Sequence, residues 1–156
     1  MKTLVKLCLF AITCTFATTA IAQTDSLKLI CPLDGAIIVP PPKNTMKYDI
    51  EDLCIVLISR PDSVVKAIGG GRITNTEFTE EGANGIVLFS RINGKDYYFW
   101  YTGLNKLLVK RNQTVKVGQA LGYVSPGEKI ELVMYEFETQ IDPLKHLSCK
   151  GVLRGF

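Results

Sequence analysis

The stretch Val115-Lys-Val-Gly-Gln-Ala-Leu-Gly122, followed by Ile130-Glu-Leu-Val-Met-Tyr-Glu-Phe-Glu138, decides the fold of this 156-residue chain. The first part contains the glycines of a tight turn. The second part is rich in the β-branched and aromatic residues that are typical of strands. Because residues two apart on a strand share a face, we expect Met134, Glu136 and Glu138 to point one way. The two aromatic residues between them should point the other way.

Short apolar runs recur along the rest of the chain, and turn residues separate them. Asn93-Gly94 lies between two of these runs and is a strong signal for a β-hairpin, because both positions accept positive φ. Leu104–Val109 and Pro143–Leu147 are each long enough for a single helical turn. Long apolar runs with helical spacing are absent after the N-terminus. We therefore predict an all-β fold, a single antiparallel β-sheet or sandwich domain with little or no helix.

The N-terminus predicts a cleavable secretory signal. Two lysines precede an apolar run, and Ala20-Ile-Ala22 forms a small-residue cleavage site. We expect residues 1–22 to be the signal peptide and residues 23–156 to form one domain, with a core over about residues 29–147. The apolar run is shorter than a bilayer requires, so we expect export to the periplasm or the extracellular space and no membrane span.

The charge and the cysteine content narrow the class of protein further. The expected signal holds two of the 18 basic side chains and none of the 15 acidic ones, which leaves 16 against 15 after cleavage. This near balance is not the signature of a nucleic-acid-binding protein. Three cysteines remain, Cys31, Cys54 and Cys149, in a compartment where disulfides persist. We expect one bridge; the pairing stays open, although Cys31 and Cys149 would close the longest loop.

The turn and strand quoted above resemble those of the LytM or lysostaphin-type zinc endopeptidases of bacterial cell walls. In that family a V-x-x-G-Q-x-I-G turn leads to a strand reading H-L-H-F-E. Further family motifs have counterparts in the correct order, among them Cys31-Pro-Leu-Asp-Gly-Ala-Ile37, Gly82-Ala-Asn-Gly-Ile-Val-Leu88 and Asp142-Pro-Leu-Lys-His-Leu147. Each motif is weak alone, and together they are a strong signal for fold. The resemblance implies the β-domain of the duplicated hybrid motif type.

The family's histidines are absent at every matched position of this chain. The motif H-x-x-x-D matches Thr45 to Asp49, so only the aspartate is kept. Gly103 stands where Y-x-H-L has a catalytic histidine, and Met134 and Glu136 stand at the two histidines of H-x-H. The resemblance thus implies a former metal and catalytic site in which no catalytic residue remains. We do not expect zinc as a cofactor.

The other possible metal ligands are few. His146 is the only histidine of the chain and lies in the closing D-P-x-x-x-L segment, away from the matched zinc strands. An all-oxygen site built from Asp49, Glu136 and Glu138 falls short of the roughly six to eight oxygen ligands that calcium takes. We therefore predict no metal site in this chain.

An aromatic run from Tyr97 to Tyr101 offers candidate contacts of another kind. Alternation along a strand places Tyr98 and Trp100 on one face. If that face is exposed, these two rings and Glu138 are possible contacts in the cleft.

Two functions remain open from the resemblance. The first is an exported, catalytically inactive module that binds, scaffolds or regulates in the cell envelope. Its partner would be peptidoglycan or an envelope protein such as a wall hydrolase. The second is a zinc metalloendopeptidase that cleaves peptidoglycan cross-links with atypical ligands. Zinc content and peptidoglycan cleavage separate the two.

Overall fold

A computed structural model describes residues 27–40, 53–60, 63–78 and 84–153. Within these residues the chain forms two β-sheets. The smaller sheet consists of β3 (Val64–Lys66), β7 (Lys106–Leu107) and β9 (Ala120–Tyr123). The larger sheet consists of β1 (Ile37–Val39), β2 (Ile55–Ile58), β4 (Gly71–Phe78), β5 (Asn84–Ile92), β6 (Lys95–Leu104), β8 (Thr114–Val115), β10 (Lys129–Glu136), β11 (Thr139–Ile141) and β12 (Val152–Leu153).

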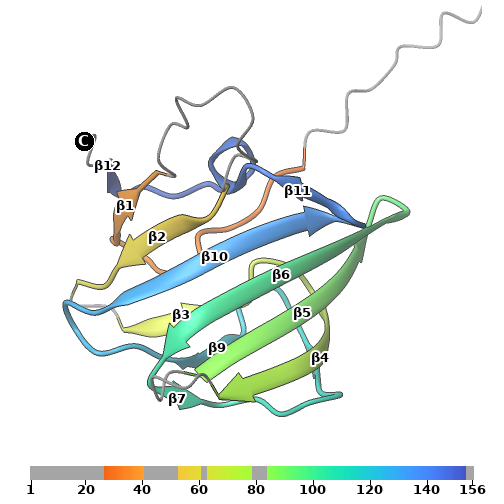
Figure 1. Cartoon of the computed structure of the whole chain (residues 1–156), viewed down its shortest axis with the longest axis horizontal. Helices are drawn as coiled ribbons and strands as arrows, with labels where there is room; N and C mark the ends of the chain where they lie inside the picture. The colour runs from red at the N-terminus through yellow and green to blue at the C-terminus, as the bar shows by residue number, and fades with distance from the viewer. Residues whose placement is uncertain (1–26, 41–52, 61–62, 79–83, 154–156) are drawn as a thin grey trace, which may run out of the picture.

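The larger sheet has the spatial order β12, β1, β2, β10, β6, β5, β4, β8, and β11 pairs with the end of β10. The smaller sheet lies behind it in the view of Figure 1. All pairs of neighbouring strands are antiparallel except β1 and β12, which run parallel. The all-β prediction is confirmed, in its two-sheet form. Among the described residues, no helix is long and apolar enough to cross a membrane.

The core lies between the two sheets and follows from alternation along the strands. On the central strands of the larger sheet every second side chain is buried: Tyr97, Phe99 and Tyr101 on β6, and Ile130, Leu132 and Met134 on β10. Val65 and Leu121 of the smaller sheet belong to the same hydrophobic core.

One buried polar contact joins this core to the chain after β3. The backbone N–H of Ile68 donates to the hydroxyl oxygen of Tyr101 at 3.0 Å. Burial raises the pKa of the Tyr101 hydroxyl, so this group stays protonated and neutral. The aromatic strand is thereby fixed to the region from which β4 begins.

The hairpin between β5 and β6 forms where Asn93-Gly94 predicts it. Asn93 has φ 52° and Gly94 has φ 78°, and the flanking residues Ile92 and Lys95 are paired. On its other edge, β6 pairs with β10 over six residue pairs, from Tyr97 with Glu136 to Thr102 with Glu131. The longest strands of the fold therefore meet at its centre.

Of the two expected helical turns, one is confirmed and one is wrong. Pro143–Lys145 forms a 3-10 helix whose N-cap, Asp142, accepts from the N–H of Leu144 at 3.0 Å. Leu104–Val109 does not form a helical turn, because it contains β7, which pairs with β9 of the smaller sheet.

A disulfide joins the first and last parts of the described chain. Cys31 and Cys149 are bonded across a sequence separation of 118. Beside the bridge, Leu29 donates to the carbonyl of His146 and accepts from Ser148, both at 2.8 Å. The two flanks of the domain are thus closed into a belt, defined as residues 27–31 and 146–149. Cys54 lies outside the bridge.

Loss of this bridge should be costly because it closes a long loop. We expect the variant Cys31→Ser/Cys149→Ser to lose about 2 to 5 kcal/mol of unfolding free energy. Urea denaturation of residues 23–156 measures this, with Cys54→Ser as the control that keeps the bridge. Equal stability of the double variant and the control would show that the belt does not constrain the fold.

Candidate functional site

The face of the larger sheet that points away from the smaller sheet is not covered by another described sheet. We call it the open face and define it by the outward side chains of Val87, Tyr98, Trp100 and Tyr135. These residues are neighbours across β5, β6 and β10, because Trp100 pairs with Val87 and Tyr98 pairs with Tyr135. Their alternation with the buried core residues places them on one surface.

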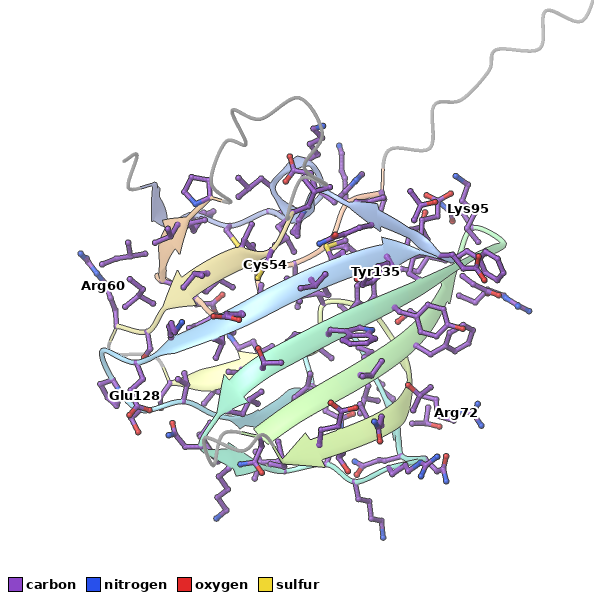
Figure 2. The ribbon with its side chains drawn as sticks, in the orientation of Figure 1. Cys54, Arg60, Arg72, Lys95, Glu128 and Tyr135 are labelled. Carbon is purple, nitrogen blue, oxygen red and sulfur yellow. A yellow bond between two sulfur atoms is a disulfide. The ribbon has the colours of Figure 1, made fainter. Side chains whose placement is uncertain are left out.

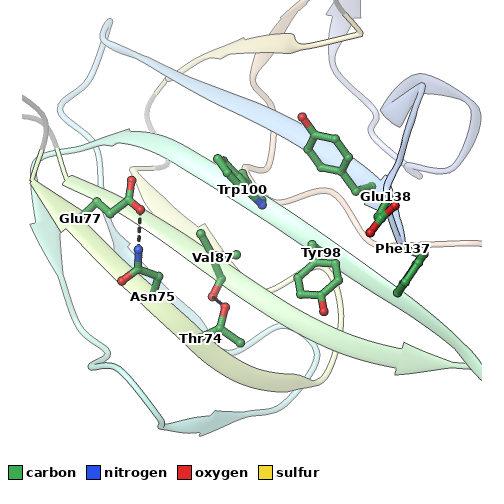
Figure 3. Close-up of a pocket in the computed structure, with 9 residues that line it drawn as sticks. Thr74, Asn75, Glu77, Val87, Tyr98, Trp100, Phe137 and Glu138 are labelled. Atoms are coloured by element: carbon green, nitrogen blue, oxygen red, sulfur yellow. Dashed lines mark hydrogen bonds between the residues drawn. The ribbon is translucent and has the colours of Figure 1, made fainter.

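A pocket of about 600 Å³ lies on this open face. Figure 3 shows Trp100, Tyr98 and Val87 in its middle, with Asn75 and Glu77 at one end and Phe137 and Glu138 at the other. We call it the aromatic pocket, and its lining residues are Thr74, Asn75, Glu77, Val87, Tyr98, Trp100, Tyr135, Phe137 and Glu138.

The rings of Trp100 and Tyr98 are each tilted against a neighbouring ring rather than stacked flat. The ring centroids of Trp100 and Tyr135 lie 5.9 Å apart at an interplanar angle of 49°. Tyr98 makes a similar contact with Phe89, at 5.3 Å and 50°. Trp100 is 43% exposed, which leaves much of its indole open to solvent. Figure 2 shows Tyr135 on β10, in the part of the sheet where the pocket lies.

Glu138 lines the pocket from a turn, whereas the sequence predicts that it lies on a strand. β10 ends at Glu136, and Phe137 and Glu138 form the turn between the paired residues Glu136 and Thr139. The expectation that Glu138 shares a strand face with Met134 is therefore wrong. The chain reverses after Glu136 because Phe137 adopts φ 54°. The turn places Phe137 and Glu138 beside Tyr135 in the pocket lining.

Glu136 does not belong to the pocket lining, and it is held by two side chains of β6. Lys95 Nζ donates to its Oε1 at 2.6 Å, and the Tyr97 hydroxyl donates to its Oε2 at 3.3 Å. The hydrogen bond from Lys95 lowers the pKa of the Glu136 carboxyl, and the same bond raises the pKa of Lys95. This carboxylate is consequently engaged in a surface ion pair at the β5–β6 turn.

The structure does not bring the matched positions on β6 and β10 together. Gly103 lies against the backbone of Lys129 and Ile130 at the start of β10. Glu136 is paired with Tyr97, six residues along β6 from Gly103, or roughly 20 Å at the usual rise per residue. The two positions are thus at opposite ends of the same pair of strands.

Met134 is also unsuited to an accessible cleft. Its side chain is 0% exposed and faces the core. The idea that Met134 lines a cleft is wrong for this reason. Thr45 and Asp49 lie outside the described residues, and their place in a former site stays a prediction.

The residues around Gly103 do not fit a zinc ion. Across the strand pair, Thr102 faces Glu131, and Glu131 forms an ion pair of 2.8 Å with Lys129. An ammonium group beside the carboxylate opposes the binding of a cation, and imidazole is absent here. His146 instead follows the 3-10 helix, where its Nδ1 lies 3.2 Å from the carbonyl oxygen of Leu27. Within the described residues, no group of three or more His, Cys, Asp or Glu could hold a metal ion.

Gly103 is closed to any larger residue. It has φ +88°, and a Cβ atom built there would lie 2.5 Å from the carbonyl oxygen of Lys129. A side chain at this position would push β6 and β10 apart. The glycine is therefore part of how the strands pack.

We expect Gly103→Ala to lower the unfolding free energy by roughly 1 to 3 kcal/mol, through the strained φ and the backbone clash. Gly85→Ala is the matched control, because the atom nearest to its Cβ would be Tyr101 O at 3.5 Å, an ordinary contact. Thermal and urea unfolding of both variants provide the measurement. Equal stability of the two variants would contradict the close approach at Gly103.

Comparison with known proteins places this geometry in context. The family model described as Peptidase family M23 matches residues 54–145. None of the curated protein sequences matches the chain significantly. The match spans β2 to the 3-10 helix and leaves the two cysteines of the disulfide outside it, one on either side.

Several solved structures share the fold. Csd3 from Helicobacter pylori has a TM-score of 0.62 and 18% identity, over 83% of this chain and 38% of its own. Lysostaphin has a TM-score of 0.52 and 21% identity, over 72% of this chain and 53% of its own. LytU has a TM-score of 0.54 and 20% identity, over 70% of this chain and 81% of its own. The chain thus spans about half of the lysostaphin structure and less than half of Csd3. Because the matched region 54–145 covers more than half of its length, the chain belongs to peptidase family M23.

Proposed function

We propose that this protein is an exported member of its family that binds peptidoglycan in the cell envelope and does not cleave it. The proposal combines the peptidase-like fold with a site that offers contacts rather than catalytic groups. The aromatic pocket on the open face would be the main contact surface.

The observation that carries the proposal is the environment of Gly103. A wall endopeptidase with histidine ligands needs several imidazoles around one zinc ion. The chain has one histidine, and it lies beside Leu27 in the belt. At Gly103 itself the backbone of β10 occupies the space that a side chain would need. In this proposal, the zinc site is lost through the close packing of β6 and β10 at Gly103 as well as through the replacement of the histidines.

The contacts of Gly103 support a second assignment of the degenerate positions on β10. Gly103 lies against Lys129 and Ile130, so the open-face residues nearest to it on β10 are Lys129 and Glu131. We infer that these two residues, rather than Met134 and Glu136, occupy the positions of the H-x-H pair. In that register the pair is Lys and Glu, held together as an ion pair.

Export is supported by the disulfide as well as by the N-terminal sequence. Disulfides persist in oxidising compartments such as the periplasm or the extracellular space and are rare in the cytosol. The bridge between Cys31 and Cys149 joins the flanks of the matched region into the belt. Such a closure stabilises the folded module, because it lowers the conformational entropy of the unfolded chain.

The aromatic pocket supports binding on general grounds. A concave, mostly apolar site with a few polar groups is the usual form of a ligand site. Exposed aromatic side chains often dominate the energy of binding surfaces. Trp100 is the most exposed ring at the centre of this surface, so it should contribute most.

Sedimentation with purified, insoluble peptidoglycan tests the proposal. We expect residues 23–156 to be retained without release of soluble wall fragments, and Trp100→Ala to weaken retention about tenfold. Tyr123→Ala is the matched control, because Tyr123 is similarly exposed, at 39%, and lies on the smaller sheet.

Two results would overturn the proposal. Release of soluble fragments that a chelator stops would favour the alternative, a zinc metalloendopeptidase with atypical ligands. A protein that is not retained by the wall, but is captured with a wall hydrolase or another envelope protein, would make that protein the partner instead.

A further inference from the structure

We propose that the aromatic pocket receives an ammonium group, such as the end of a lysine side chain in a peptide. The inference deepens the proposed function and rests on it for its biological role, since it names the ligand chemistry of the same surface. The rings, the charge of the lining and the conformation of Phe137 each support it.

The first support is the arrangement of the rings. Tyr98 and Tyr135 are directly paired across the strands, and the ring of Trp100 is tilted at 49° to that of Tyr135. The face of an aromatic ring carries negative potential and attracts a cation within about 6 Å of its centroid. Tilted rings around one pocket can direct more than one face at the same cation. A flat sugar ring is better matched by a single open platform.

The second support is the charge of the pocket lining. Among the described residues, the carboxylates of the lining are Glu77 and Glu138, and no lysine, arginine or histidine lines the pocket. Glu77 accepts a hydrogen bond from Asn75. Within the described residues, Glu138 has no ion-pair partner. The pocket therefore presents one carboxylate at each end and disfavours anions.

The arginines near the pocket are absent from its lining. Arg72 is paired with Phe89 across β4 and β5, and Arg91 forms an ion pair of 2.6 Å with Asp96. Arg111 Nε donates to the carbonyl oxygen of Thr74 at 3.1 Å, on the outer edge of β4. The guanidinium is thereby bound to the backbone of the sheet edge and is absent from the pocket lining. The end of the pocket formed by Phe137 and Glu138 lies opposite this edge in Figure 3.

The third support is Phe137. A bulky residue with φ near +54° is a backbone outlier where glycine is preferred. Its ring is 64% exposed, so burial in the core does not offset that strain. The backbone is fixed by a 2.8 Å hydrogen bond from the Phe137 N–H to the carbonyl of Asp96. Strain of this kind is typical of functional sites, and here it holds a ring at the rim of the pocket.

The single tryptophan of the chain is a direct reporter for the test, because Trp100 lies in this pocket. Residues 23–156 are titrated at constant ionic strength with Nα-acetyl-lysine amide, followed by Trp fluorescence. Nα,Nε-diacetyl-lysine amide is the matched neutral ligand, because acetylation of Nε converts the ammonium group into a neutral amide and leaves the rest of the ligand unchanged. A chitin trisaccharide serves as the neutral sugar. We expect saturable binding of the charged lysine and at least fivefold weaker binding of the other two.

Two variants locate the site. Phe137→Gly removes the ring and relieves the positive φ, so we expect unchanged or higher stability with about fivefold weaker lysine binding. Glu138→Gln should weaken binding to a similar extent. Glu128→Gln is the control, because Glu128 is an exposed carboxylate outside the pocket lining, and this variant should bind as the parent does.

The inference is overturned if the diacetylated ligand or the sugar binds as tightly as the charged lysine, or if no lysine binding is seen. Lysine binding that Phe137→Gly and Glu138→Gln leave unchanged would also overturn it. The experiments distinguish a failure of the lysine-binding inference from a failure of the proposed peptidoglycan binding. Trp100-dependent retention on peptidoglycan without lysine binding removes this inference alone, and lysine binding without wall retention removes the proposed function alone.

Discussion

The register of β6 against β10 is the constraint on which the rest of the structure depends. Six residue pairs join the two strands at the centre of the larger sheet. Because side chains alternate with a period of two, a slip of one residue would exchange the buried and open faces. In the observed register Met134 packs in the core and Tyr135 lines the aromatic pocket. The same register places the close contact at Gly103 far from the ion pair of Glu136.

The fold could be predicted from local signals that agree with one another. Asn93-Gly94 predicts the hairpin, and the alternation of large aromatic residues along β6 predicts one buried and one open face. The turn at Phe137 could not be predicted, because an aromatic residue is not expected at positive φ. Nor could β7, since its pairing with β9 depends on strands that are distant in sequence. Tertiary contacts override local preference in such segments.

The site was less predictable than the fold for a related reason. Comparison of sequence motifs assigned the histidine positions to Met134 and Glu136. A sequence motif alone does not show which face of the sheet a residue occupies. The buried side chain of Met134 and the contact of Gly103 with Lys129 supply that information. The choice among three disulfide pairings was likewise open in the sequence. The structure joins Cys31 to Cys149 because the flanks of the domain lie side by side through Leu29.

These features describe a peptidase-like sheet with a pocket of about 600 Å³ on its open face, and no cluster of three or more His, Cys, Asp or Glu side chains that could hold a metal ion is found among the described residues. The most direct test of this account is the metal content of residues 23–156, purified without added metal and measured by elemental analysis. We predict zinc far below one equivalent. One equivalent of zinc that is lost in the variant Asp49→Ala would contradict the account, because it would mean that the former site still holds its metal.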